Sequence, residues 1–396
     1  AMQLATTLGL EARLLPTNDE KRQIYVINKG KPTPMPDGVL LIVPTKFTPF
    51  ALSPLISPAG KVRMGMDLFI KPKTDGEDET LADFITRRLG SEALDKIAEP
   101  LMSGIYNAEA ERQSVLATFP RFRTLEEQHG SLIKGMLASR AQRTAAAPSN
   151  GGKPKSVFMS MRDGMTELVS AVTAQLTGDL RLETTVQGIT KQEDGYLLTL
   201  SDGESLSAKS VVLAIPAHAA AKLLQTPAPA AASALEEIRY VSTGTISFAF
   251  RETDIQHPLN GFGVVIPRSE GRAINAVTWT STKFDHRAPA GAVLLRCFFG
   301  GSRRPDMMNV PDDELVTVVR RELEELLGID AEPLFTRIYR WFDANPQYDV
   351  GHLDRVAAIQ AALPENLFVT GSPYGGVGIP DCIHQAEQTA TAVASV

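Results

Sequence analysis

This 396-residue sequence is poor in cysteine, in net positive charge and in long apolar runs. Cys297 and Cys382 form no closely spaced pair and have no histidine at zinc-ligand spacing, so we expect neither a disulfide framework nor a metal site. We interpret both as small buried apolar residues in a protein of a reducing, cytoplasmic compartment. The formal net charge of -6 excludes a basic nucleic-acid surface. The most apolar run, 211–221, is far shorter than the ~20 residues of a membrane span.

Common catalytic motifs are also missing. The chain has no GxGxxG, GxxxxGK[ST], HExxH or GxSxG, and its six histidines lie far apart. Runs such as Glu236-Glu237 and Asp312-Asp313 are typical of solvated faces or helix starts. The sequence therefore shows no acid–base machinery, which a cofactor-dependent enzyme can do without because the cofactor performs the difficult step.

The length predicts two or three domains, and a content of 43% hydrophobic and 22% charged residues is typical of a folded protein. Met2, Ala5 and Leu8 have helical spacing that closes on Gly9. Because the chain also starts with Ala, we expect residue 1 to be an internal position of a longer protein. No signal peptide is predicted at this end.

The pattern along the chain predicts α/β and α+β organisation. Apolar alternation and turn residues indicate strands and hairpins, while apolar spacing of three and four residues with Gly or Pro stops indicates helices. Expected helices are 80–89, 91–99 stopped by Pro100, 124–140, 166–176 and 312–327. Expected strands are 22–28 with a hairpin turn at 28–30, 157–161, a doubly covered strand at 210–217, an antiparallel sheet within 243–299, and 367–370. A loop or linker is expected at 145–156.

A glycine-rich turn at 371–378 leads from the last strand into a helix that begins at Pro380. Free backbone N–H groups and the positive end of a helix dipole favour an anion here, such as a phosphate or a reduced flavin ring. Glycine also lets a flat ring approach the backbone closely. An ordinary glycine turn would leave the same pattern.

Several segments together resemble the protoporphyrinogen oxidase family, which includes a coproporphyrinogen-oxidising bacterial branch. The resemblance runs in family order across essentially the whole chain, and the second and third segments below are specific to it. The segments are VFMSMRDGMTELVSAV (157–172), PLMSGIYNAEAERQS (100–114), FVTGSPYGGVGIPDCI (368–383), SVVLAIPA (210–217) and WFDANPQYDVGHL (341–353).

The resemblance implies an incomplete three-layer domain of the FAD/NAD(P)-binding type, an antiparallel-sheet substrate domain and a helical insertion. The family's N-terminal strand with GxGxxG is not in this sequence, so the chain is expected to bind FAD weakly or not at all. The implied boundaries are 1–16, 157–236 and 361–396 for the FAD-binding domain, 17–62 and 237–360 for the substrate domain, and 63–156 for the insertion.

The resemblance also implies FAD-dependent, six-electron oxidation of a porphyrinogen in haem biosynthesis, by hydride transfer to flavin N5. Oxygen would be the acceptor, with no catalytic protein base. Further implied features are contact of the insertion with a membrane surface, an association with ferrochelatase or another haem-pathway enzyme, and a homodimer.

Site residues are carried over by position. Arg22 resembles the family's propionate-binding arginine, and its replacement by alanine is expected to raise KM roughly tenfold. The other implied substrate residues are Gly104, Phe262, Gly263, Val265, Val277 and Phe298. The implied cofactor-binding residues are Val186, Trp341, Gly371, Gly376, Val377, Gly378, Ile379 and Asp381. From composition alone, most of these positions could equally be core or surface residues.

Two alternatives stay open at this point. The first is another flavin enzyme, such as an amine oxidase, which would need an aromatic pair before the flavin, with Trp341 and Tyr374 as a partial candidate. A carotenoid-desaturase-type enzyme belongs to the same alternative. The second is a non-catalytic porphyrin-binding protein.

Overall fold

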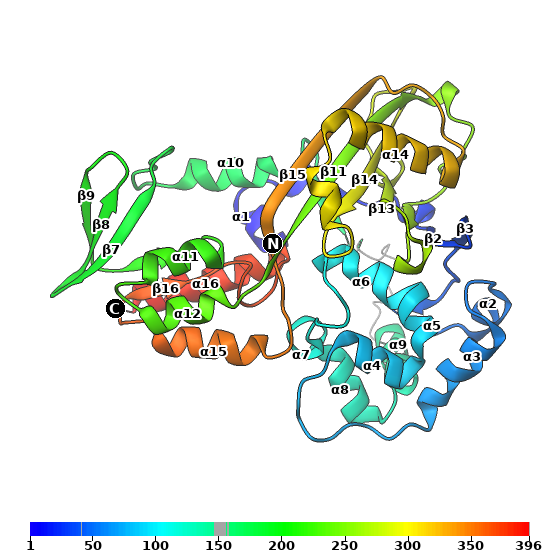
Figure 1. Cartoon of the computed structure of the whole chain (residues 1–396), viewed down its shortest axis with the longest axis horizontal. Helices are drawn as coiled ribbons and strands as arrows, with labels where there is room; N and C mark the ends of the chain where they lie inside the picture. Colours follow the sequence, from blue (N-terminus) through cyan, green and yellow to red (C-terminus); the bar gives the residue numbers. More distant parts are fainter. Residues whose placement is uncertain (41, 146–155, 157, 396) are drawn as a thin grey trace.

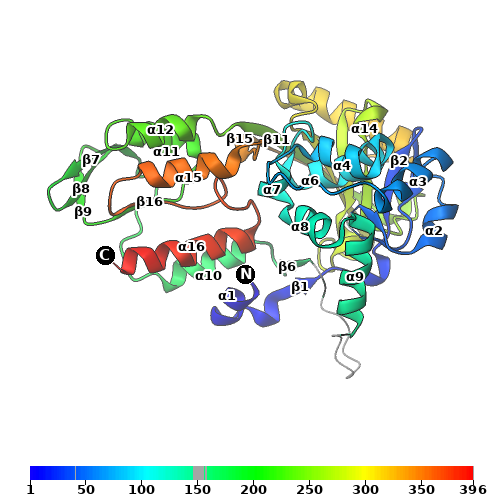
Figure 2. The same ribbon diagram turned by 90° about the horizontal axis from the view of Figure 1, so that it is seen from below.

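A computed structural model describes residues 1–40, 42–145, 156 and 158–395. Two lobes are visible: one contains a large sheet and a cluster of helices, and the other contains a two-stranded sheet among helices with a three-stranded sheet at its far end (Figures 1 and 2). The long strands β11 (Tyr240–Arg251) and β15 (Phe335–Pro346) run from the first lobe toward the second. The domain boundaries given above stay a prediction.

The large sheet has seven strands in the order β15-β11-β14-β13-β12-β2-β3. All neighbours are antiparallel except β12 and β2, which are parallel. The predicted antiparallel sheet is confirmed, and so is the hairpin turn, where Lys29 and Gly30 have φ of 54° and 74°. The strands not yet bounded are β2 (Ile24–Asn28), β3 (Lys31–Pro34), β12 (Gly263–Val265), β13 (Ile274–Trp279) and β14 (Ala292–Gly300).

Helix α14 (Asp312–Leu327) covers one face of this sheet, as its apolar spacing predicts (Figure 1). It ends at Gly328, which has φ of 65°. Cys297 and Phe299 of β14 are fully buried on this face, so the interpretation of Cys297 as a core residue is confirmed. Since side chains alternate along a strand, their neighbours in sequence lie on the opposite face of the sheet.

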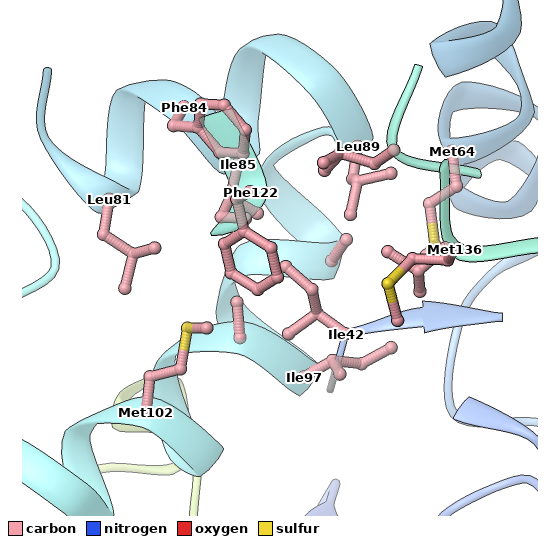
Figure 3. Close-up of a cluster of buried hydrophobic side chains, with 14 of the residues drawn as sticks. Ile42, Met64, Leu81, Phe84, Ile85, Leu89, Ile97, Met102, Phe122 and Met136 are labelled. Carbon is pink, nitrogen blue, oxygen red and sulfur yellow. The ribbon is translucent and has the colours of Figure 1, made fainter. Parts of the chain in front are cut away.

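A helical unit packs near the β2 end of that opposite face. Its core joins Ile42, Met64, Phe84 and Phe122 (Figure 3), and Val26 of β2 belongs to the same cluster. Among the described residues, no helix is long and apolar enough to cross a membrane. The helices are α2 (Phe47–Leu52), α3 (Pro58–Gly65), α4 (Leu81–Leu89), α5 (Ser91–Ala93), α6 (Glu99–Tyr106), α7 (Val115–Thr118), α8 (Pro120–His129) and α9 (Leu132–Ala145); strands β4 (Val39–Leu40) and β5 (Val43–Pro44) precede them.

Two helix ends predicted in this unit are wrong. Pro100 does not stop a helix: it lies in the first turn of α6, where proline is tolerated because the N–H it lacks would have no partner. A π-helical turn at Leu94–Ala98 connects α5 to α6. The helix expected over 124–140 is divided at Gly130, which ends α8 with φ of 69°. The loop predicted at 145–156 falls almost entirely outside the described residues.

In the second lobe, β10 (Val211–Leu213) pairs in parallel with β16 (Leu367–Val369). Val211 and Leu213 are buried, but Val212 is 42% exposed, so the expected covering of both faces of β10 is wrong. The pair packs with α11 (Ala217–Leu224), α12 (Pro229–Glu236) and α15 (His352–Ala362). The remaining elements are α1 (Met2–Thr7), β1 (Leu14–Pro16), β6 (Met159–Met161), α10 (Thr166–Gln175), β7 (Val186–Gln192), β8 (Gly195–Leu200), β9 (Ser205–Ala208), α13 (Thr280–Lys283) and α16 (Ile379–Ala394).

Candidate functional site

The glycine-rich turn lies between β16 and the start of α16. Gly371 and Gly376 have φ of 109° and 134°, a region that side-chain-bearing residues rarely adopt. A Cβ on Gly376 would lie 2.6 Å from the Cβ of Asp381, so a larger residue would collide there. Glycine is therefore required at these two positions, of which Gly371 is partly exposed and Gly376 is buried. We call the turn backbone from Gly371 to Gly378 the ledge.

Side chains from three segments hold this turn in place. The Tyr348 hydroxyl donates to the Ser372 carbonyl at 2.6 Å and accepts from the Gly376 N–H at 2.8 Å. The Gln385 side-chain oxygen accepts from the Gly375 N–H at 3.1 Å. These hydrogen bonds fix the turn's conformation before any ligand binds, which is the preorganisation that a binding site needs.

His352 is fully buried and contacts the same turn. Its ring stacks on Tyr348 with centroids 4.0 Å apart, and its Nε2 lies 3.1 Å from the Tyr374 carbonyl. That geometry makes the neutral tautomer with a proton on Nε2 the donor. Burial lowers the pKa of His352 below its usual value, so the folded protein holds this ring neutral.

The lowered pKa predicts acid sensitivity. The unfolded chain binds a proton at His352 once the pH falls through about 6.5, while the folded protein resists it, so the stabilisation is present above that pH and lost below it. We expect the melting temperature to fall between about pH 6.5 and pH 5, and to fall less steeply in His352→Gln, whose amide can still donate to Tyr374. The exposed His384, replaced in the same way, is the control and should leave the slope unchanged. Parallel slopes for wild type and His352→Gln would contradict this account.

No side chain caps the start of α16 within the described part of the chain. The N-cap residue is Gly378, and Pro380 follows in the first turn. The helix N-terminus therefore presents uncapped N–H groups next to the ledge. Beside β16 and α16 lies a cavity of about 750 Å³, whose lining includes Thr370, Tyr374 and Gln385.

A second feature lies on the face of the large sheet opposite α14. The strand register places side chains in rows across neighbouring strands, with the rows two residues apart on one face. We call this surface the open face. One row runs Val265, Ala276, Phe298, Thr245, Tyr339, and the next runs Gly263, Thr278, Arg296, Ser247, Arg337.

The open face contains an aromatic surface and a pocket. Tyr339 and Trp341 of β15 stack with ring centroids 5.9 Å apart and are 52% and 45% exposed. A pocket of about 240 Å³ lies toward β12 and β13 and is lined by Val265, Phe298 and Lys283, together with Leu101 of α6. It is smaller than the roughly 300–1,000 Å³ of pockets that enclose a drug-sized ligand. A large ring would therefore fill the pocket with one edge and extend along the open face.

Positive charge gathers beside this pocket. The Lys283 ammonium lies 5.4, 5.7 and 5.6 Å from the ring centroids of Phe158, Phe262 and Phe284. Burial, and secondly the neighbouring Arg296, lower the pKa of Lys283. Burial, and secondly Arg287, lower the pKa of Arg296. Among the described residues, no carboxylate forms an ion pair with either Lys283 or Arg296.

The structure brings part of the sequence-based substrate set together. Val265 and Phe298 line the pocket, and the ring of Phe262 lies beneath Lys283. Gly104 lies in α6, which borders the pocket through Leu101. Arg22 is exposed just before β2.

Val277 does not line the pocket. It lies on the α14 side of β13 and is 1% exposed in the core, because its neighbours Ala276 and Thr278 occupy the open face. Gly263 belongs to the open-face row, where it allows β13 to approach closely. The carry-over by position did not account for this alternation of side chains.

The sequence-based cofactor set divides into three places. Gly371, Gly376, Val377, Gly378, Ile379 and Asp381 form the turn and the start of α16. Trp341 belongs to the open face of β15, and Val186 begins β7, which contacts α11. Tyr374 is buried and lines the cavity beside α16, so it forms no aromatic pair with Trp341. The described residues contain no cluster of possible metal ligands.

Sequence reasoning missed Tyr348, His352, Lys283, Arg296 and Arg337. Tyr348 and His352 lie in the quoted segment 341–353, but the glycine turn that they contact is more than 20 residues further along the chain. A periodicity-two pattern along β14 and β15 could have placed Arg296 and Arg337 on one face. Nothing local indicates that α13 brings Lys283 beside them.

A glycine turn at an uncapped helix start beside a large sheet is an arrangement that can bind an anionic cofactor. Its sequence matches the profile of flavin containing amine oxidoreductases over residues 1–394, and the chain belongs to that family. It is 34% identical to a coproporphyrinogen III oxidase of Bacillus subtilis, over 98% of this chain and 82% of the relative. It is 32% identical to a chloroplastic protoporphyrinogen oxidase of Nicotiana tabacum, over 99% of this chain and 74% of the relative.

Solved structures agree with this assignment. A crystal structure described as a candidate protoporphyrinogen oxidase of Exiguobacterium sp. 255-15 superposes with a TM-score of 0.85 at 28% identity. The superposition covers 99% of this chain and 84% of the crystallised chain. The resemblance to the protoporphyrinogen oxidase family and the mixed α/β and α+β fold are thereby confirmed.

The residues at the start of α16 fit the ring end of a flavin. Gly371 and Gly378 are partly exposed and carry no side chain, and the uncapped helix start favours the negative charge of a reduced ring. The backbone of Val377, Gly378 and Ile379 would hold that end. Asp381 is exposed, and its Oδ2 lies 2.8 Å from a Cβ placed on Gly378, so its carboxylate stands next to the turn.

Proposed function

We propose that this protein uses FAD to oxidise a porphyrinogen to the porphyrin. The observation that supports this best is the open face, where stacked aromatic rings lie beside cations that have no carboxylate partner among the described residues. A reduced tetrapyrrole is a large apolar ring with carboxylate side chains, and both parts find matching surfaces there. The names of the relatives point to the same substrate class.

In this reaction the protein's own side chains bind and orient the substrate and do not take part in bond breaking. Each bridging carbon of a porphyrinogen lies between pyrroles that delocalise positive charge, so a hydride can leave from it and a pyrrole N–H can then lose its proton. Bound FAD supplies the hydride acceptor. Phe298, Tyr339 and Trp341 offer stacking surface for the ring, while the cations orient it through its carboxylates.

The balance of the reaction needs an external oxidant. Six electrons and six protons leave the macrocycle in three two-electron steps. We propose oxygen as the acceptor, reduced to three molecules of hydrogen peroxide. No protein base is required to hold a proton at any step, which agrees with the absence of an acid–base constellation in the sequence.

Amine oxidation is the alternative that the family name suggests. A protonated amine would meet Lys283, Arg296 and Arg337 on the open face, and like charges repel it. The same charges attract carboxylates. The electrostatics of this face therefore favour the porphyrinogen.

The test is turnover by the purified protein in air with FAD in large excess, because the chain is expected to bind FAD weakly. We expect porphyrin fluorescence to grow from a freshly reduced porphyrinogen faster than in the enzyme-free control, with no peroxide formed from a primary amine. Tight binding of the porphyrin product should be visible separately as a shift of its absorbance. Amine turnover without porphyrin binding would overturn the proposal.

A further inference from the structure

Three cations gather at one end of the open face, and they come from three separate elements. Arg296 of β14 and Arg337 of β15 lie on either side of Ser247 of β11, in one row of the sheet. Strands are about 4.8 Å apart, so their Cα atoms are roughly 10 Å apart. The third cation, Lys283, is the last residue of α13 and lines the pocket itself.

Lys283 and Arg296 lie close to each other, whereas cations in folded proteins are usually paired with carboxylates. Lys283 is half-buried among three aromatic rings, and it faces Arg296 instead of a carboxylate. Arg287 also lies near Arg296, but its guanidinium donates hydrogen bonds to the carbonyls of Arg162 and Met161 at 2.7 Å each. Lys283 is half-buried and Arg296 is solvent-accessible, and holding two like charges close together costs stability unless an anion compensates them. The cost is lowered when a ligand brings that anion.

We infer that Lys283 and Arg296 bind propionate carboxylates of the substrate and make this protein select coproporphyrinogen over protoporphyrinogen. The inference rests on the proposed function, because it names the members of the porphyrinogen class that this site accepts. Arg337 of β15 lies in the same row, across β11 from Arg296.

The two substrates differ in the side groups that they would place next to Lys283 and Arg296, and this difference produces the selectivity. In coproporphyrinogen every pyrrole carries a propionate, whereas protoporphyrinogen has vinyl groups in place of some of them. A vinyl group beside Lys283 would leave the ammonium without an anion in a half-buried pocket. A site built for a charged partner rejects the analogue that lacks it, because its own buried group is then left unpaired.

The experiment measures binding of stable porphyrins to the full 396-residue protein, so it does not depend on turnover. Coproporphyrin III, its tetramethyl ester and protoporphyrin IX are titrated with wild type, Lys283→Gln and Arg296→Gln. Wild type is expected to bind coproporphyrin at least about tenfold more tightly than the ester. Each variant should weaken coproporphyrin about tenfold and leave the ester unchanged.

Matched controls separate charge from packing. Lys283→Arg keeps the positive charge and should bind coproporphyrin more tightly than Lys283→Gln does. Lys191→Gln removes an exposed lysine of β7 in the other lobe and should change nothing. If Lys283→Gln does not fold, Arg296→Gln is the second test, because the Arg296 side chain reaches the surface of the open face and its replacement leaves no cavity in the core.

Failure of this inference looks different from failure of the proposed function. Equal binding of coproporphyrin and its ester, with both variants unaffected, would overturn the role of Lys283 and Arg296 and leave a porphyrin site in place. Equal losses for the acid and the ester would also overturn it, because they would show an apolar contact. No binding of any porphyrin to wild type would instead contradict the proposed function.

Discussion

Replacing Arg88 with methionine is expected to lower the free energy of unfolding by about 3–5 kcal/mol. Arg88 of α4 and Asp67 are both fully buried in the helical unit and form an ion pair, with Arg88 Nε 2.5 Å from Asp67 Oδ1. The same guanidinium donates to the carbonyls of Ile70 and Gly130 at 3.0 Å each. Methionine preserves much of the volume but leaves Asp67 as a buried charge that has lost its cation.

The neighbouring arginine gives a matched control. Arg87 also binds Glu126, but its side chain is 28% exposed, and Arg123 holds Glu126 as well. Arg87→Met should therefore cost only about 1 kcal/mol. Urea unfolding followed by circular dichroism measures both. Equal losses for the two variants, or a loss under about 1 kcal/mol for Arg88→Met, would contradict the role of the buried pair.

Replacing Gly263 with alanine is expected to cost about 3–5 kcal/mol, the second large effect. Gly263 begins β12 with φ of 142°, and a Cβ there would lie 2.1 Å from the Val277 carbonyl oxygen. Both the φ angle and the contact involve backbone, so no side-chain rotation relieves them. Separation of β12 from β13 would also displace Val265 from the pocket and weaken porphyrin binding.

Gly271 serves as the comparison. It also has a positive φ, 66°, but a Cβ there meets nothing within 4 Å. Gly271→Ala should cost about 1–2 kcal/mol and leave porphyrin binding unchanged. Calorimetric melting of both variants, with coproporphyrin titration, makes the comparison. Melting temperatures that fall equally would show that the close approach of the two strands is not what requires Gly263.

The sequence was a good guide where structure is local. Helix α14 was predicted over residues 312–327 and is found there, because apolar spacing and the terminal Gly328 act within one element. Predictions failed where one residue type can serve two roles: Pro100 begins a helix instead of ending one, and Gly130 interrupts a helix expected to be continuous. Val212 of β10 is exposed although its run is uniformly apolar, which only the packing around the strand decides.

By itself the sequence determined the family, the class of fold and the glycine turn at α16, because each depends on motifs or periodicity within short segments. The tertiary structure alone decided which residues share the open face and which lie in the core. It brought Lys283 beside Arg296 and Arg337, and it placed Tyr348 and His352 under the glycine turn. The physical reason is that strand register and helix docking join segments distant in the chain, and no local propensity encodes which segments those are.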